Sequence, residues 1–179
     1  MAAGTDTGTD TGAILGLVQQ ERVRYKTRWT IRRFASDETF LEGRSYSESV
    51  IDGNLLLNEG IAELWDLACG LGAPTAFSNA NARIGVGDSN TAESAAHTGL
   101  QASTNKLYKA MESGYPQRSG QTVTWRAVFG SSDANFAWNE FTVANGNSDA
   151  SKNLNRKVSA QGTKASGQTW TLDLAITLS

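Results

Sequence analysis

The residues with the greatest capacity for chemistry are few and isolated in this sequence. A single histidine, His97, stands in the run Ala-Ala-His-Thr-Gly, and a single cysteine, Cys69, follows an alanine. One histidine excludes mechanisms that need two imidazoles, and one cysteine excludes an internal disulfide and a multi-cysteine zinc site. No motif fixes the nucleophile elbow or oxyanion hole of a serine–histidine–acid site. We expect a surface or hydrogen-bonded His97 and a buried, inert Cys69.

Other candidate motifs are equally weak. The glycine-rich run Ile-Gly-Val-Gly-Asp-Ser at 84–89 lacks the third glycine of a dinucleotide fingerprint and the Gly-Lys-Ser/Thr of a phosphate-binding loop. We interpret it as a strand whose glycines allow close backbone approach, ending in a turn. Asp37 and Glu38 form a carboxylate pair without an aromatic sugar platform. We expect no catalytic, cofactor-binding or metal-binding residues, no cofactor, and a protein that is not an enzyme.

The composition favours a β-rich domain. The chain has 179 residues, a net charge of −2, 39% hydrophobic residues, only 19% charged residues and 18 glycines. This length fits one domain with a short appendage. No apolar run approaches the roughly 18 residues of a membrane span, and near-neutral charge is atypical of nucleic-acid binders. We therefore expect neither a membrane nor a specific nucleic acid among the partners.

The first residues differ from the rest of the chain. Residues 1–12 repeat Gly-Thr-Asp-Thr almost literally, a polar pattern that predicts a flexible arm over 1–20 and a single β-rich domain over 21–179. A short apolar plug follows the repeat. Its apolar residues are Ile14, Leu15, Leu17 and Val18. We expect this plug to bind a partner surface, on its own domain or on a neighbouring subunit.

The segment from 22 to 34 alternates between mostly apolar and mostly basic residues, which predicts a strand with one buried and one basic face. The candidate partner-binding cations are Arg22, Arg24, Lys26, Arg28 and Arg32. A return strand over 45–51 would bring Glu48 and Asp52 against this face. The basic face is either a solvated edge that discourages aggregation, or a surface for an acidic protein or packaged nucleic acid.

One helix is expected, over residues 54–71. Its apolar residues recur at three- and four-residue spacing and form one stripe. The stripe is Leu57, Ile61, Leu64, Trp65, Ala68 and Leu71. Asn54 is a candidate N-cap, Gly70 or Gly72 a candidate left-handed end, and Gly60 indicates close packing.

Alternating strands are expected in the remainder. They cover 82–86, 107–111, 122–129, 135–143 with a bulge near Asn139, and 169–178. A short helix is the alternative for 107–111. The predicted fold is mainly β: an antiparallel β-sandwich or barrel-like domain with one packed helix and an extended N-terminal arm. All five tryptophans fall in predicted elements, so we expect them in the core. They are Trp29, Trp65, Trp125, Trp138 and Trp170.

Five further runs stand in a characteristic order. They are Asn-Leu-Leu-Leu-Asn-Glu-Gly at 54–60, Ala-Asn-Ala-Arg-Ile-Gly-Val-Gly-Asp-Ser at 80–89, Ala-Asn-Phe-Ala-Trp-Asn-Glu at 134–140, Leu-Asn-Arg-Lys at 154–157 and Gly-Thr-Lys at 162–164. Taken in order, these runs resemble the structural proteins of tailed-bacteriophage virions, including a domain of tail-collar and fibre proteins. The resemblance covers about residues 50–179 and brings no enzymatic residues.

The resemblance implies a structural role in a virus particle. A capsid-surface decoration (cement) protein ranks first, because such a protein is small, β-rich and single-domain, with an arm that reaches neighbouring subunits. Its partners would be the major capsid protein or other virion proteins, with self-association in the particle. It would lie on the particle exterior, and in the host cytoplasm during assembly. A tail, collar or fibre-associated protein ranks second, and a carbohydrate-binding β-sandwich module, which would need an exposed pair of tryptophans, third.

Overall fold

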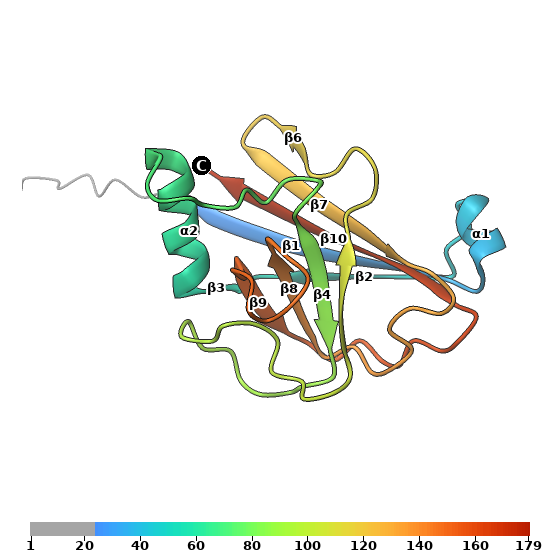
Figure 1. The fold of residues 1–179 in the computed structure, drawn as a ribbon. Coiled ribbons are helices and arrows are strands. Elements are labelled where there is room, and N and C mark those ends of the chain that lie inside the picture. The colour runs from blue at the N-terminus through green and yellow to red at the C-terminus, as the bar shows by residue number, and fades with distance from the viewer. Residues whose placement is uncertain (1–23) are drawn as a thin grey trace, which may run out of the picture.

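The computed structural model describes residues 24–179. Two antiparallel five-stranded sheets make up most of this part of the chain (Figure 1). The first sheet has the order β2-β1-β10-β7-β6. Its strands are β2 (Ser47–Asp52), β1 (Tyr25–Phe34), β10 (Thr169–Leu178), β7 (Thr122–Phe129) and β6 (Gln117–Ser119). The first and last long strands of the described chain therefore lie side by side at the centre of one sheet.

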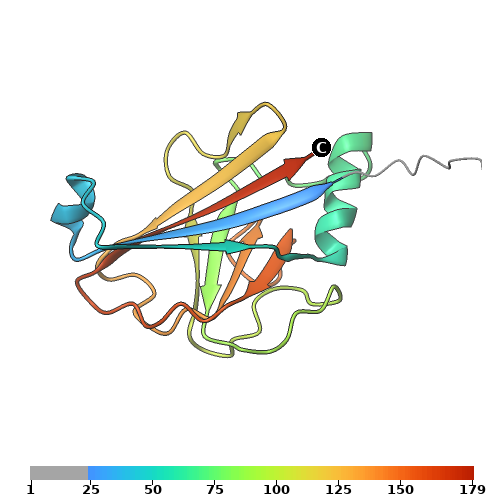
Figure 2. The same ribbon diagram turned by 180° about the vertical axis from the view of Figure 1, so that it is seen from behind.

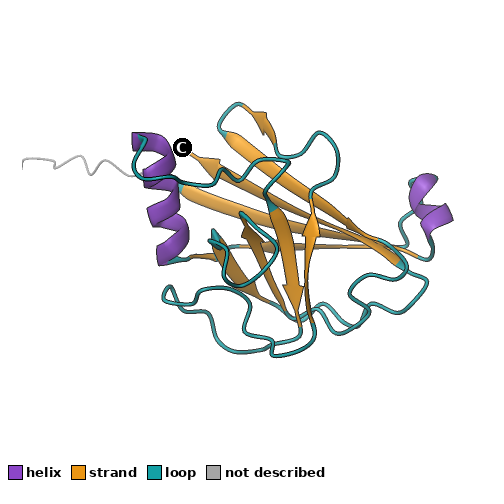
Figure 3. Cartoon of the chain, in the orientation of Figure 1, coloured by secondary structure: helices purple, strands orange, loops and turns teal. Residues whose placement is uncertain are grey.

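The second sheet has the order β3-β9-β8-β4-β5. Its strands are β3 (Leu55–Leu56), β9 (Asn155–Val158), β8 (Glu140–Ala144), β4 (Arg83–Gly87) and β5 (Lys106–Ala110). Trp29 of the first sheet meets Phe141 of the second at 5.8 Å between ring centroids, and Trp138 lies 4.9 Å from Trp170. The two sheets thus share one aromatic core. The mainly β prediction is confirmed, in the form of a sandwich (Figure 3).

The alternating segments form strands because each places one set of side chains in the core. In β1, Trp29 and Ile31 are fully buried, while Lys26 and Arg28 on the opposite face are exposed. All ten residues of β1 pair with β10. The predicted return strand is β2, which pairs with β1.

The predicted strand over 135–143 is shorter than expected. Only Glu140–Ala144 forms β8, and the residues before it form a loop with one isolated bridge, from Ala137 to Thr163. The change occurs at Asn139, whose backbone N–H donates to Gly87 and whose side chain donates to the Asp88 carbonyl. Trp138 still enters the core, as expected.

Two helices stand at opposite ends of the sandwich (Figure 1, Figure 2). The short α1 (Asp37–Leu41) lies in the connection between β1 and β2 and begins with a capping box at Ser36. Its Phe40 packs on Phe34, with 5.2 Å between the ring centroids. The predicted helix is α2 (Asn58–Cys69). No helix within residues 24–179 is long and apolar enough to cross a membrane.

The predicted start of α2 is wrong and its predicted end is confirmed. Asn54 precedes β3 and accepts a hydrogen bond from the Tyr25 hydroxyl at 2.9 Å, so it does not cap the helix. The N-cap residue is Leu57, which is fully buried and offers no side-chain acceptor. At the other end Gly70 adopts the left-handed conformation, with φ of 67°.

Candidate partner-binding surface

The outer face of β1 carries the cations that the alternation predicts. Arg24, Lys26 and Arg28 are exposed, whereas Arg32 is half-buried. The expected partners on β2 are confirmed: Arg28 lies 3.2 Å from Asp52, and Arg32 lies 2.7 Å from Glu48. Within residues 24–179, Arg24 and Lys26 form no ion pair. The cations left for a partner are therefore those at the start of β1.

An acid on the neighbouring strand neutralises the other end of this face. Asp173 of β10 accepts two hydrogen bonds of 2.7 Å from Arg126 of β7 and one of 3.2 Å from Arg32. The hydrogen bonds to Asp173 raise the pKa of Arg126. The two guanidinium groups cover Asp173, which is almost fully buried. This part of the face is internally balanced.

An open hollow of about 550 Å³ lies beside Lys26. Lys26 and Arg28 line it from β1, Ala175 and Thr177 from β10, and the turn at 52–54 closes one side. Its charged groups are two cations and one carboxylate, that of Asp52. The hollow therefore suits an acidic side chain better than a basic one.

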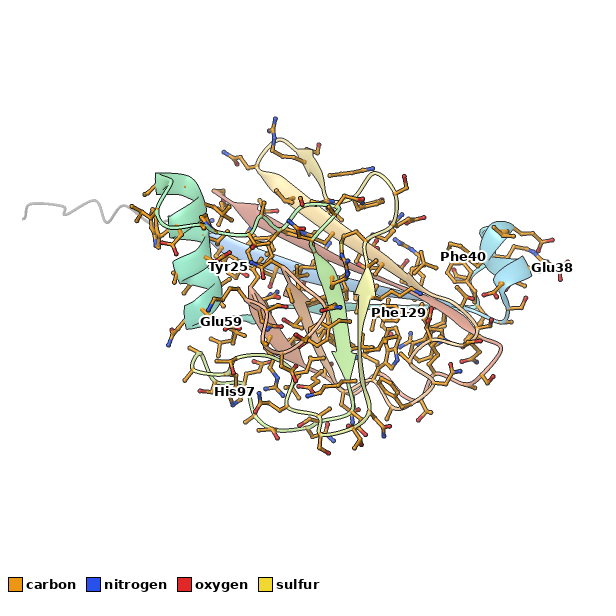
Figure 4. The ribbon with its side chains drawn as sticks, viewed as in Figure 1. Tyr25, Glu38, Phe40, Glu59, His97 and Phe129 are labelled. Atoms are coloured by element: carbon orange, nitrogen blue, oxygen red, sulfur yellow. The ribbon has the colours of Figure 1, made fainter. Side chains whose placement is uncertain are left out.

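Helix α2 is attached to the sandwich by the side that carries Glu59, Gly60 and Glu63, and the half-buried Leu67 also packs against the core. The Glu63 carboxylate accepts hydrogen bonds from the Thr75 backbone N–H at 2.6 Å and the Asn145 side chain at 2.8 Å. Glu59 accepts from the Asn153 backbone N–H at 2.8 Å (Figure 4). Gly60 and Glu63 are the buried residues of the helix. The expected close packing at Gly60 is confirmed.

The expectation that the apolar stripe of α2 packs into the core is wrong. Beyond the buried Leu57, the stripe points outward. The large exposed residues are Ile61, Leu64, Trp65 and Leu71. Trp65 is 64% exposed, so the core assignment fails for this tryptophan but holds for the other four. Cys69 is exposed as well, which corrects the prediction of a buried thiol.

A buried ion pair and the single histidine hold a loop on the second sheet. Glu140 and Arg156 are fully buried and form an ion pair of 2.7 Å. Glu140 accepts from the backbone N–H groups of 101 and 102, while Arg156 donates to the carbonyls of 91 and 92. His97 lies in the same loop, with Nδ1 3.3 Å from Arg156, as a hydrogen-bonded histidine (Figure 4). We call Glu140, Arg156 and His97 the loop network, because they fasten residues 91–102 to the second sheet.

The glycine-rich run and Asp37 are also structural. A Cβ atom at Gly87 would lie 2.5 Å from Glu140, and one at Gly85 would lie 2.7 Å from Thr142, which confirms the expected close approach. Asp37 accepts hydrogen bonds from the hydroxyls of Thr169 and Ser131, and these bonds lower the pKa of Asp37. They tie α1 to the end of the sandwich.

Lys164, from the Gly-Thr-Lys run at 162–164, also makes structural hydrogen bonds. Lys164 is fully buried and donates 2.8 Å hydrogen bonds to the Gly130 carbonyl and the Asn135 side chain. Burial lowers the pKa of its ammonium group. Lys164 and Asn135 both come from the runs that carry the virion-protein resemblance, so these runs supply polar contacts that hold loops onto the sandwich.

Part of the predicted surface lies outside the described residues. Those residues are Ile14, Leu15, Leu17, Val18 and Arg22. Within the described part of the chain, no three His, Cys, Asp or Glu residues gather as a metal site would require. Periodicity does not predict the outward orientation of the α2 stripe, because it identifies the stripe and not the side of the helix that faces the sandwich.

Comparison of the chain with protein-family models, with curated proteins and with solved structures found no match in any of the three.

Proposed function

We propose that this protein is a non-enzymatic structural protein of a tailed-bacteriophage particle, and that it decorates the outer capsid surface and bridges capsid subunits. The resemblance of residues 50–179 to virion structural proteins motivates the class. The observation that carries the proposal is that the buried or hydrogen-bonded charged side chains make structural contacts. Glu140, Arg156, Lys164 and Asp37 each hold loop or helix segments in place.

The exposed start of β1 is the docking surface in this proposal. Arg24 and Lys26 have no ion-pair partner in residues 24–179, and the hollow beside Lys26 can receive an acidic side chain. An acidic surface of the major capsid protein is the partner that this charge pattern suits. Each such contact would be weak, and many copies on a particle would add their contributions.

The tryptophans favour this role over sugar binding. Stacking modules need exposed aromatic rings, and four of the five tryptophans are at most 7% exposed. Trp65 is the exposed one, without the planar partner that a sugar platform needs. The tail or collar role differs from decoration in where the protein binds on the particle.

Imaging tests the proposal directly. Particles assembled without the protein are incubated with the purified chain and examined by negative-stain microscopy. Added density over the head supports decoration, density on the tail supports the second role, and no binding contradicts both.

Charge reversal tests the surface. We expect Arg24→Glu/Lys26→Glu to reduce particle occupancy, most strongly at low salt, because screening weakens the contact of the unmodified chain at high salt. Arg118→Glu/Lys152→Glu is the matched control, since both side chains are exposed, lie elsewhere and give the same charge change. Equal occupancy for the two double variants would exclude the β1 face.

A further inference from the structure

The outward face of α2 is a continuous apolar surface. We call this surface, made of Ile61, Leu64, Trp65, Ala68, Cys69 and Leu71, the α2 face. Ile61, Trp65 and Cys69 form one row at four-residue spacing, and Leu64 and Ala68 form the next row. Leu64 is 43% exposed and Leu71 is 55% exposed. An exposed apolar patch of this kind marks a binding surface.

The chain itself contains a matching apolar segment a few residues before β1 in the sequence. Residues 14–18 read Ile-Leu-Gly-Leu-Val, and they are the one apolar cluster in the sequence before β1. Six residue steps separate Val18 from Arg24, which gives a reach of about 20 Å in an extended chain. Both segments are uncharged, so their contact buries no unpaired charge.

The start of β1 lies beside α2, so this reach is sufficient. Both views show the first described residues next to the helix (Figure 1, Figure 2). Tyr25 points toward the residues before α2 and donates its hydroxyl to Asn54 at 2.9 Å (Figure 4). The helix itself is about 18 Å long. Residues 14–18 can therefore reach the α2 face without any change in the sandwich.

We propose that residues 14–18 bind the α2 face of the same molecule. The short connection makes the contact intramolecular, and a short tether gives an effective concentration in the millimolar range, about what a weak apolar contact needs. A second copy would have to reach comparable concentrations in solution to compete. This inference does not depend on the proposed virion function, because it concerns the isolated protein.

Tryptophan fluorescence tests the contact in the full chain. The other four tryptophans are buried, so acrylamide quenching reports mainly on Trp65. We expect Leu15→Asp/Leu17→Asp to increase the quenching of Trp65 and shift its emission to the red. The matched control is Thr5→Asp/Thr7→Asp, which adds the same charge to the polar repeat. Equal quenching in the two double variants would overturn the proposal.

The native thiol at the end of α2 tests which molecule is bound. Single cysteines are introduced at 14, 15, 17 and 18 in turn, and each variant is oxidised at low protein concentration. We expect a disulfide with Cys69 within the monomer for at least one position, and none in the Cys69→Ser background. A cysteine at Thr7 controls for random collision. Cross-linked dimers in place of monomers, or no cross-link at any of the four positions, would overturn the proposal.

Discussion

Gly60 of α2 lies directly against the backbone of Leu154. A Cβ atom at position 60 would stand 2.5 Å from both the Cα atom and the carbonyl oxygen of Leu154. The next contact of that atom would be the Asn153 carbonyl at 2.7 Å. Backbone atoms, unlike a flexible side chain, cannot move aside cheaply. The absence of a side chain at Gly60 therefore lets α2 sit on the segment that leads into β9.

Gly60→Ala should destabilise the protein by about 1–3 kcal/mol through overpacking. The sign is informative, because alanine in an unconstrained helix stabilises by about 1 kcal/mol relative to glycine. Urea unfolding followed by circular dichroism measures the difference. Ala62→Gly, at an exposed position of the same helix outside the α2 face, is the control and should cost only the propensity difference. A stabilised Gly60→Ala variant would contradict the contact with Leu154.

The orientation of α2 shows the limit of prediction from periodicity. A three- and four-residue repeat identifies a helix and one apolar stripe, and it does not say which side faces the body. Burial of Glu63 requires the Thr75 N–H and Asn145 side chain, which come from distant segments. Only the tertiary structure brings these donors together. The helix could be predicted from the sequence, and its outward apolar face could not.

The long strands could be predicted because alternation of apolar and polar residues identifies both the strand and the face that it buries. In β10, Leu172 and Leu174 alternate with polar residues, and this pattern predicts a strand whose leucine face is buried. The loop before β8 breaks this rule at Asn139, whose side chain bonds to a neighbouring strand end. The basic face of β1 was predicted with its acidic partners on β2. Its neutralisation by Asp173 was not, since that pairing depends on strand order.

Two tryptophans with opposite environments give a matched test of the core. Trp170 is 2% exposed and packs on Trp138, so Trp170→Ala should cost about 3–5 kcal/mol. Trp65 is largely exposed, and Trp65→Ala should change stability far less in the same denaturant titration. If the Trp170→Ala variant unfolded at the denaturant midpoint of the parent, the assignment of β10 to the core would be wrong.

We expect the stability of the protein to depend strongly on the ion pair within the loop network. Arg156→Met leaves the Glu140 carboxylate buried without its partner, and we expect a loss of about 3–5 kcal/mol. Glu140→Gln should also destabilise, and the double variant should lose less than the sum of the two. Denaturant unfolding of the four proteins completes the double-mutant cycle.

The exposed ion pair between Arg28 and Asp52 provides the control for Arg156→Met, because Arg28→Met also removes a paired arginine. Arg28 and Asp52 form an ion pair at the surface, where such pairs contribute about 0–1 kcal/mol. Arg28→Met should therefore have a small effect. Equal effects of Arg28→Met and Arg156→Met would show that the loop network does not stabilise residues 91–102.

The hydrogen bonds of Asp37 predict how the stability of the protein changes with pH. Hydrogen bonds from Thr169 and Ser131 lower its pKa in the folded protein, so the ionised carboxylate favours folding above its unfolded pKa. This contribution is lost as the pH falls through the lowered, folded-state pKa. The stability difference between the parent and Asp37→Asn should therefore be largest near neutral pH and shrink in acid, as measured by unfolding at a series of pH values. Glu38→Gln removes a charge from the same helical turn; a difference of equal size and pH profile for that variant would rule out a specific role for the Thr169 and Ser131 bonds.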